Sequence, residues 1–177
     1  TLLETLQGLA APQGAVATPK GFWYVANSGK SNVLVYRTAR KGPKYVRSLD
    51  DSGEIPNNVD VTADQQLVAV SNETSPSSGI GSVSVYLSAA SEPSRILTYG
   101  NDVLAGQGVA IDAQGNCLWS FNDLSKPSAP GSIVEFDQCS GAGTLLISSL
   151  TIAGGMTFDR AGNLYYIDEA HGIYKCR

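Results

Sequence analysis

The sequence repeats one short pattern, and this repetition constrains the fold more than any other feature. Gly108–Asn122 consists of an apolar run, an Asp-x-x-Gly-Asn turn and a second apolar run that ends in Asn. Gly155–Asp168 has the same order of residue types, and weaker copies start at Gly14 and Asn58. Two apolar runs joined by a short turn with glycine predict a tight β-hairpin. We therefore expect four related hairpins along the chain.

The spacing of these copies predicts the architecture. They start at residues 14, 58, 108 and 155, and three of the repeats contain a later apolar run that ends in an aromatic residue, at Tyr36, Tyr86 and Phe136. Repeats of about 40 to 50 residues with four short strands each are typical of β-propeller blades. We predict an all-β single domain, a β-propeller of four-stranded antiparallel blades. Its four blade units are expected at residues 8–51, 52–101, 102–149 and 150–177.

The last repeat stops after its third strand, and its missing fourth strand has a candidate at the other end of the chain. Thr1–Leu6 precedes the first repeat and begins Thr-Leu-Leu, as does Thr144–Leu150 before the fourth repeat. An N-terminal strand often completes the final blade of a propeller, because this removes an exposed sheet edge. We expect residues 1–7 to complete the fourth blade. A fragment of a larger propeller, and assembly with further blades or a second chain, both remain open.

The residues around the turns also resemble a known family. GQGVAIDAQGNCLWSFN and AGGMTFDRAGNLYYID are similar to the blade signature of NHL-repeat and related six- to eight-bladed propellers. APQGAVATPKGFWYVAN lacks the Asp, and IPNNVDVTADQQLVAVSN is the most divergent copy. The resemblance implies a propeller similar to secreted or envelope-associated bacterial ones. It implies no particular activity, because this fold hosts binding modules, scaffolds and enzymes.

Composition and charge restrict the class of partner. The net charge of −4 over 177 residues argues against a general nucleic-acid binder, which needs a concentrated positive surface. Five of the 12 basic residues lie between Arg37 and Arg47, which we interpret as a solvated outer hairpin or as a docking patch for an acidic partner. No apolar run reaches the roughly 18 residues of a membrane span.

Three cysteines are present, Cys117, Cys139 and Cys176. Cys117 opens the second strand of its repeat and Cys139 follows the third, and these ends lie together in antiparallel neighbours. A disulfide between them is geometrically allowed, and two free thiols are the alternative. A disulfide would suit a secreted, periplasmic or cell-surface protein. Cys176 would then be unpaired within this chain.

Trp23 and Trp119 occupy corresponding positions in the second apolar runs of their repeats. We interpret both as packing between neighbouring blades. A sugar-stacking platform is the alternative.

The loops that lead into the innermost strands converge at the axial mouth of a propeller, where an enzyme would place its reacting groups. In this sequence they carry amides and glycines, with Gln13, Asn57, Asn58 and Gln107 as the candidate binding residues. Similar propellers of the lactonase type bind Ca²⁺ or Mg²⁺ with carboxylates and an Asn, and only Asn57 or Asn58 matches that pattern. A divalent-metal-dependent hydrolase or lyase is therefore the alternative function.

Polar residues also recur where the second strands end. Asn27, Asn72, Asn122 and Asp168 could form a polar ring that binds a ligand, or their side chains could bond the following turns. His171 is a further candidate for the binding face. Asp168 beside His171 could tune a proton carrier, and an ordinary turn is the alternative. We find no catalytic constellation, no metal set and no cofactor motif. The sequence favours a non-catalytic binding or assembly module for a protein or glycan partner, which would use the mouth and the loops at residues 71–81 and 122–131.

Overall fold

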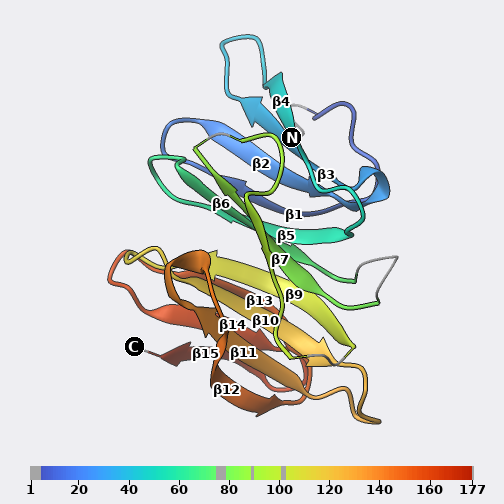
Figure 1. The fold of residues 1–177 in the computed structure, drawn as a ribbon. Helices are drawn as coiled ribbons and strands as arrows, with labels where there is room; N and C mark the ends of the chain where they lie inside the picture. Colours follow the sequence, from blue (N-terminus) through green and yellow to red (C-terminus); the bar gives the residue numbers. More distant parts are fainter. Residues whose placement is uncertain (1–4, 75–78, 89, 101–102, 177) are drawn as a thin grey trace.

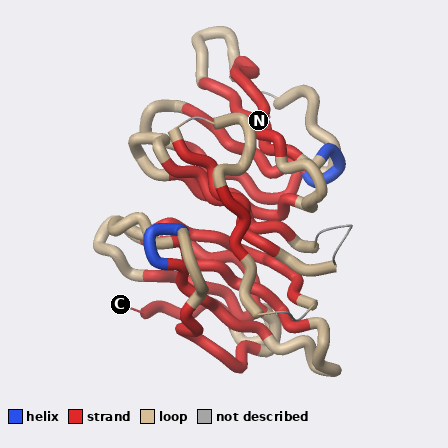
Figure 2. Tube along the Cα trace, viewed as in Figure 1, coloured by secondary structure: helices blue, strands red, loops and turns tan. Residues whose placement is uncertain are grey.

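The computed structural model describes residues 5–74, 79–88, 90–100 and 103–176. Figures 1 and 2 show an all-β chain in which short strands alternate with turns and loops. The prediction of a β-propeller with four blade units is confirmed. Each unit is an antiparallel sheet in which strands that follow one another in the sequence are neighbours.

The first two sheets contain four strands each. The first consists of β1 (Pro12–Ala17), β2 (Phe22–Asn27), β3 (Asn32–Arg37) and β4 (Lys44–Asp50). The second consists of β5 (Pro56–Val61), β6 (Leu67–Asn72), β7 (Ser82–Leu87) and β8 (Arg95–Leu97). A short 3-10 turn, η1 (Ser28–Lys30), joins β2 to β3.

The third sheet has four strands and the fourth has three in the described part of the chain. The third consists of β9 (Leu104–Ile111), β10 (Cys117–Asp123), β11 (Gly131–Phe136) and β12 (Thr144–Leu150), with η2 (Asp137–Cys139) after β11. The fourth consists of β13 (Ala153–Phe158), β14 (Leu164–Asp168) and β15 (Gly172–Cys176). The innermost strands β1, β5, β9 and β13 contact one another in this order, so the sheets follow one another around an axis.

The N-terminal segment lies on the first blade. Leu6 packs against a buried cluster on one face of this sheet, and the Tyr36 hydroxyl donates a hydrogen bond to the carbonyl of Gln7. The other face of the sheet packs on the second blade, so this segment covers apolar side chains that have no neighbouring blade. The expected completion of the fourth blade by residues 1–7 is therefore not seen for residues 5–7, and Thr1–Glu4 lie outside the described residues.

The hydrophobic core fills the spaces between successive sheets. Tyr24 and Tyr86 belong to the cluster between the first and second blades, and Trp119 and Phe136 to the cluster between the second and third. Trp119 is fully buried and donates to the Ser71 hydroxyl at 3.0 Å, as the packing interpretation predicts. Trp23 is 42% exposed, so it does not have the role of Trp119. The neighbouring Tyr24 points to the second blade instead.

The Asp-x-x-Gly-Asn motif forms a self-contained turn. The Asp112 carboxylate accepts hydrogen bonds from the backbone N–H groups of Gln114 and Asn116 at 2.9 and 2.8 Å, and from the Asn116 amide at 2.9 Å. Gly115 donates to the Asp112 carbonyl and has φ +88°, a conformation that favours glycine. Asp159 repeats the same arrangement with Asn163. The motif therefore specifies the hairpin turn locally.

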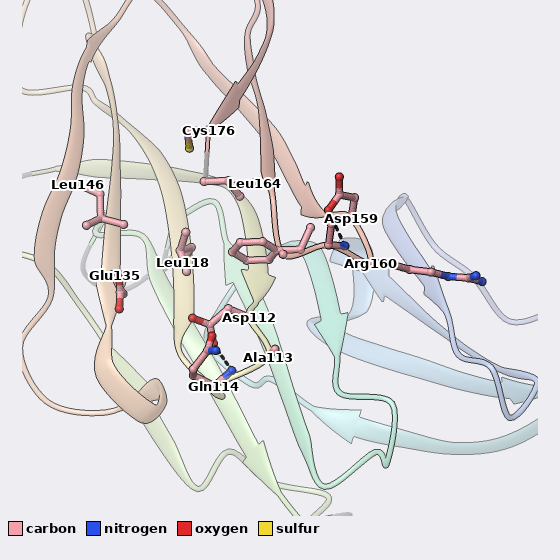
Figure 3. Close-up of a pocket in the computed structure, with 13 residues that line it drawn as sticks. Asp112, Ala113, Gln114, Leu118, Glu135, Leu146, Asp159, Arg160, Leu164 and Cys176 are labelled. Carbon is pink, nitrogen blue, oxygen red and sulfur yellow. Dashed lines mark hydrogen bonds between the residues drawn. The ribbon is translucent and has the colours of Figure 1, made fainter.

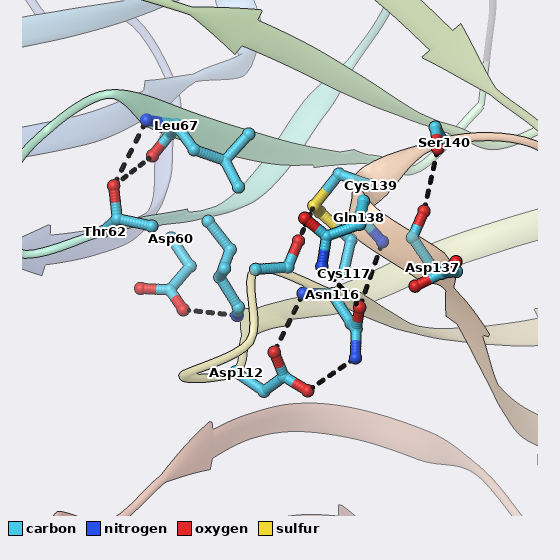
Figure 4. Close-up of a disulfide and its surroundings, with 12 residues drawn as sticks. Asp60, Thr62, Leu67, Asp112, Asn116, Cys117, Asp137, Gln138, Cys139 and Ser140 are labelled. Carbon is cyan, nitrogen blue, oxygen red and sulfur yellow. Dashed lines mark hydrogen bonds between the residues drawn. A yellow bond between two sulfur atoms is a disulfide. The ribbon is translucent and has the colours of Figure 1, made fainter.

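Cys117 and Cys139 form a disulfide, which confirms this sequence hypothesis. Their Cα atoms are 4.8 Å apart, and both residues are fully buried. Figure 4 shows Gln138 folded over the neighbouring turn, where its backbone N–H donates to Asn116 Oδ1 at 3.0 Å and its amide donates to the Gln114 carbonyl at 2.7 Å. These bonds and the disulfide hold the end of the third sheet together. Cys176 is unpaired and half-buried.

Candidate functional site

The predicted binding residues lie at one end of the sheets. In each blade the start of the innermost strand pairs with the end of the second strand, as Pro56 does with Asn72 and Ala153 with Asp168. The mouth amides and the polar residues at the second-strand ends therefore lie toward one face of the propeller. We call this end, where β5 begins and β6 ends, the mouth face.

The polar residues at the second-strand ends are buried and bonded internally. Asn122 forms a paired contact with the next blade, because its Oδ1 accepts from the Ala153 N–H at 2.8 Å and its Nδ2 donates to the Ala153 carbonyl at 3.3 Å. Asn72 donates to the Ser82 and Ser84 hydroxyls at 2.9 Å each. These two side chains hold the framework, which favours the structural interpretation over a binding ring.

Asp168 also holds a turn. Its carboxylate accepts backbone hydrogen bonds from Thr151 at 3.0 Å and Ile152 at 3.3 Å, and it lies 3.0 Å from His171 Nδ1. The hydrogen bond from the Thr151 N–H is the largest cause that lowers the pKa of Asp168, to about 2, and the His171 contact lowers it further. His171 itself projects into solvent, and its Nδ1 is also 3.2 Å from the Thr151 hydroxyl. The pair joins a buried carboxylate to an exposed imidazole in a turn at the edge of the mouth face.

The amides on the innermost strands have a different environment. Gln13 is exposed, and Asn57, Asn58 and Gln107 are partly exposed. Asn57 Nδ2 donates to the Gly106 carbonyl at 3.1 Å, which links β5 to β9. Within the described part of the chain, the side chains of Gln13 and Gln107 have no hydrogen-bond partner, and they are therefore available to a ligand.

Close approach of the backbones explains the glycines at the mouth. A Cβ atom built on Gly106 would lie 2.2 Å from the Asn72 carbonyl oxygen, and one built on Gly14 would lie 2.9 Å from the Asn57 carbonyl oxygen. Side chains at these positions would force neighbouring blades apart. The glycines therefore serve packing around the axis.

The sequence predicts that two loops, at residues 71–81 and 122–131, determine specificity, and the structure describes all of the second but only part of the first. Of residues 71–81, the segment 75–78 lies outside the described residues. In the loop at residues 122–131, Lys126 Nζ lies 2.6 Å from Asp123 Oδ2. This ion pair and a Ser125 hydrogen bond lower the pKa of the Asp123 carboxyl. The loop is held by local contacts close to β10.

The opposite end of the propeller contains two hollows that the sequence did not reveal. One, of about 570 Å³, lies between the third and fourth blades, with Leu118, Phe158 and Leu164 in its lining and Asp112 and Glu135 among its charged residues. Figure 3 shows Leu118 and Glu135 beside this hollow, whereas the labelled Arg160 extends away from it. The sequence shows each residue, but only the packing of two blades places them together.

The second hollow, of about 700 Å³, lies between the turns of the second, third and fourth blades. Asp60 is in its lining and accepts a hydrogen bond from the Ile111 N–H at 2.8 Å, which links β5 to β9. Burial raises the pKa of the Asp60 carboxyl, while backbone hydrogen bonds from Ile111 and Val61 lower it. The carboxylates Asp112 and Asp159 in the same lining are bonded within their own turns. Asp60, Asp112 and Asp159 in this hollow therefore already have hydrogen-bond partners.

The residues that the structure describes contain no group of three or more His, Cys, Asp or Glu side chains placed to hold a metal ion. At the mouth, the carboxylates of the lactonase pattern are not found beside Asn57 and Asn58 in the described strands. Among the described residues, no helix has the length and apolar character needed to cross a membrane.

No protein-family model matches the chain, and no curated protein sequence matches it. Several solved structures resemble its fold. A structure of a nidogen–laminin complex matches with a TM-score of 0.67 and 13% identity over 94% of this chain and 60% of that one. Hydrazine synthase of Kuenenia stuttgartiensis matches with a TM-score of 0.65 and 16% identity over 88% of this chain and 43% of that one.

A calcium-binding protein, regucalcin of Agrobacterium tumefaciens, matches with a TM-score of 0.64 and 11% identity over 94% of this chain and 54% of that one. The chain spans about half the length of the structures it matches. These neighbours are β-propellers, and they include both binding proteins and enzymes. At such low identity the comparisons establish the β-propeller fold alone.

Proposed function

We propose that the chain is a non-catalytic binding module that recognises a protein or glycan partner through the mouth face. The amides of the innermost strands are the observation that supports this most directly. Gln13 on β1 and Gln107 on β9 stand on either side of Asn57 and Asn58 on β5, and their side chains form no hydrogen bond with the residues that the structure describes. Neutral amides both donate and accept hydrogen bonds, so they suit peptide groups and sugar hydroxyls.

The polar residues at the second-strand ends have a structural role, which leaves binding of the partner to the mouth amides. Asn72, Asn122 and Asp168 fix the ends of the strands. The mouth amides are therefore displayed on a framework whose own polar groups are largely satisfied, and rigid display lowers the ordering cost of binding. His171 extends this surface at its rim, where its side chain is 57% exposed.

Binding selections with the folded chain test this proposal. Arrays of glycans and of peptides would be screened with the unmodified chain, with the Gln13→Ala/Gln107→Ala variant, and with Gln114→Ala as the control. Gln114 is an exposed glutamine at the opposite end of the propeller. We expect binders whose affinity falls by about tenfold or more in the double variant and is unchanged in the control. Binders that respond to Gln114→Ala and not to the double variant would contradict the mouth face as the recognition surface.

We also propose a secreted, periplasmic or cell-surface location, which the buried disulfide supports because such bonds persist in oxidising compartments. The intact mass of the protein isolated under non-reducing conditions, before and after reduction, tests whether the bond is present. Assembly with further blades or with a second chain stays a prediction, and the mass in solution tests it.

A further inference from the structure

The loop between β4 and β5 carries two buried carboxyl groups. Asp51 is 1% exposed and Glu54 is 8% exposed. The loop is a tight turn, in which the Glu54 N–H donates to the Asp51 carbonyl at 3.0 Å. Both residues belong to the connection between the first and second blades, outside the innermost strands and apart from the mouth amides. Burying two acidic groups is costly unless their charge is compensated.

Both carboxyl groups are bonded to side chains of β7. The Tyr86 hydroxyl lies 3.0 Å from Asp51 Oδ1, and the Ser82 hydroxyl donates to Glu54 Oε2 at 3.0 Å. The Ser84 hydroxyl is also near enough to the Asp51 carboxyl to lower its pKa. The Asn72 amide nitrogen donates to the hydroxyls of both serines, at 2.9 Å each. The Asn72 side chain is therefore placed inside this cluster, between the partners of the two acids.

Two oxygen atoms of the cluster have no partner. Asp51 Oδ2 and Asn72 Oδ1 are the buried side-chain nitrogen or oxygen atoms that lack a hydrogen bond among the residues that the structure describes. Asn72 is fully buried. Exchanging its oxygen and nitrogen would not help, because the Ser82 hydroxyl gives its single proton to Glu54 Oε2 and can therefore only accept from the Asn72 side chain. Both open positions are acceptors, so the missing group must be a donor or a cation.

We propose that a calcium ion binds between Asp51, Glu54 and Asn72 and joins the interblade loop to the second blade. The cluster offers only oxygen ligands, from carboxylates, an amide and hydroxyls, and hard cations such as Ca²⁺ prefer this donor set. The two carboxylates would balance the charge of a divalent ion. Such an ion would also bind the two oxygen atoms that lack a partner. A buried acceptor without a partner otherwise costs stability.

The electrostatics of the loop agree with this geometry. Burial is the largest cause that raises the pKa of Asp51, to about 7, and the charges of Glu54 and Asp50 raise it further. The groups that lower this pKa are the hydroxyls of Ser84 and Tyr86, which are neutral. Burial likewise raises the pKa of Glu54. The site therefore disfavours uncompensated negative charge.

Binding of Ca²⁺ to chelator-treated protein tests the proposal. The unmodified chain, Asp51→Asn, Glu54→Gln and the control Glu92→Gln would be titrated with CaCl₂ by calorimetry and by thermal unfolding. Glu92 is an exposed acid whose replacement removes the same charge from the surface. Tb³⁺ can replace Ca²⁺, and its luminescence sensitised by aromatic side chains reports whether the ion lies near Tyr86. Circular dichroism establishes that each variant is folded.

We expect one Ca²⁺ per chain, a rise in the unfolding temperature on adding Ca²⁺, and Tb³⁺ luminescence that Ca²⁺ displaces. Asp51→Asn and Glu54→Gln should each weaken binding by about tenfold or more, while Glu92→Gln should bind as the unmodified chain does. Absence of Ca²⁺ binding to the unmodified chain would overturn the proposal and assign the two open oxygens to a water molecule or a proton. Binding that survives in both cluster variants would also overturn it. Neither result depends on a mouth-face partner.

Discussion

Replacing both disulfide cysteines by alanine should destabilise the protein by about 3 kcal/mol. Cys117 and Cys139 are 22 residues apart in the sequence, so the bond closes a loop of about that length in the unfolded chain. Chain-entropy estimates for such a loop give about 3 kcal/mol at 25 °C. Both residues are fully buried, and the small cavities left by removing two sulfur atoms add to this loss.

The folded geometry should survive this replacement, because other bonds hold the same residues. Gln138 donates from its backbone to Asn116 and from its side chain to Gln114, and these contacts do not involve sulfur. The loss of stability should therefore arise largely from a less constrained unfolded state. The dependence of unfolding on urea should become somewhat steeper, because the unfolded chain without the bond exposes more surface.

Urea unfolding followed by tryptophan fluorescence measures this effect, since Trp119 is fully buried in the same sheet as the disulfide. Cys176→Ala is the matched control, because it removes a half-buried thiol and leaves the disulfide intact. The control should change the free energy of unfolding by less than the double variant does. A loss below about 1 kcal/mol in the double variant, or an equal loss in the control, would refute the reasoning from loop closure.

Two further predictions concern the second-strand ends. Asn122→Ala should lower the free energy of unfolding, measured with urea, by about 2 kcal/mol, because it leaves the N–H and carbonyl of the buried Ala153 without their side-chain partners. A change within about 0.5 kcal/mol would contradict the role of Asn122 between the blades. The pKa of Asp168 is about 2 in the folded protein, against an ordinary value of 3.8. The ionised carboxylate therefore stabilises the fold above about pH 4, and this contribution is lost as the pH falls toward 2. Asp168→Asn should therefore lack that part of the acid-induced loss, and parallel stability curves between pH 5 and 2 for the two proteins would show that the carboxylate has no such role.

The sequence by itself determined the features that depend on bonds between near neighbours in the chain. The Asp112 and Asp159 turns close through contacts within four residues, so the same letters give the same turn wherever they occur. Their repetition at blade spacing was enough to predict four β-sheets and an all-β fold. The disulfide could be predicted as one of two alternatives, because strand order already placed the ends of β10 and β11 together.

The register of the strands and the packing of neighbouring blades determine which aromatic side chain faces the next blade, which the turns do not determine. Trp23 and Trp119 are the tryptophans of corresponding second strands, yet the residue that faces the next blade in the first sheet is Tyr24. Side chains alternate between the two faces of a strand, so a shift of one residue moves an aromatic ring from the core to the surface. Counted back from the strand-ending Asn27 and Asn122, Tyr24 stands at the position of Trp119, and the packing of the blades shows that this alignment is the one that holds.

The tertiary structure also decided which polar groups remain available. The N-terminal segment covers the first blade because that sheet has an apolar face with no adjoining blade, and its Leu-rich sequence would have suited either end of the propeller. Asn72, Asn122 and Asp168 look alike as strand-ending residues, but each bonds a different partner. Asn72 bonds the next strand of its own sheet, Asp168 bonds the segment that leads into the strand beside it, and only Asn122 reaches another blade. Strand pairing and the packing of blades, which the letters do not distinguish, decide between these roles.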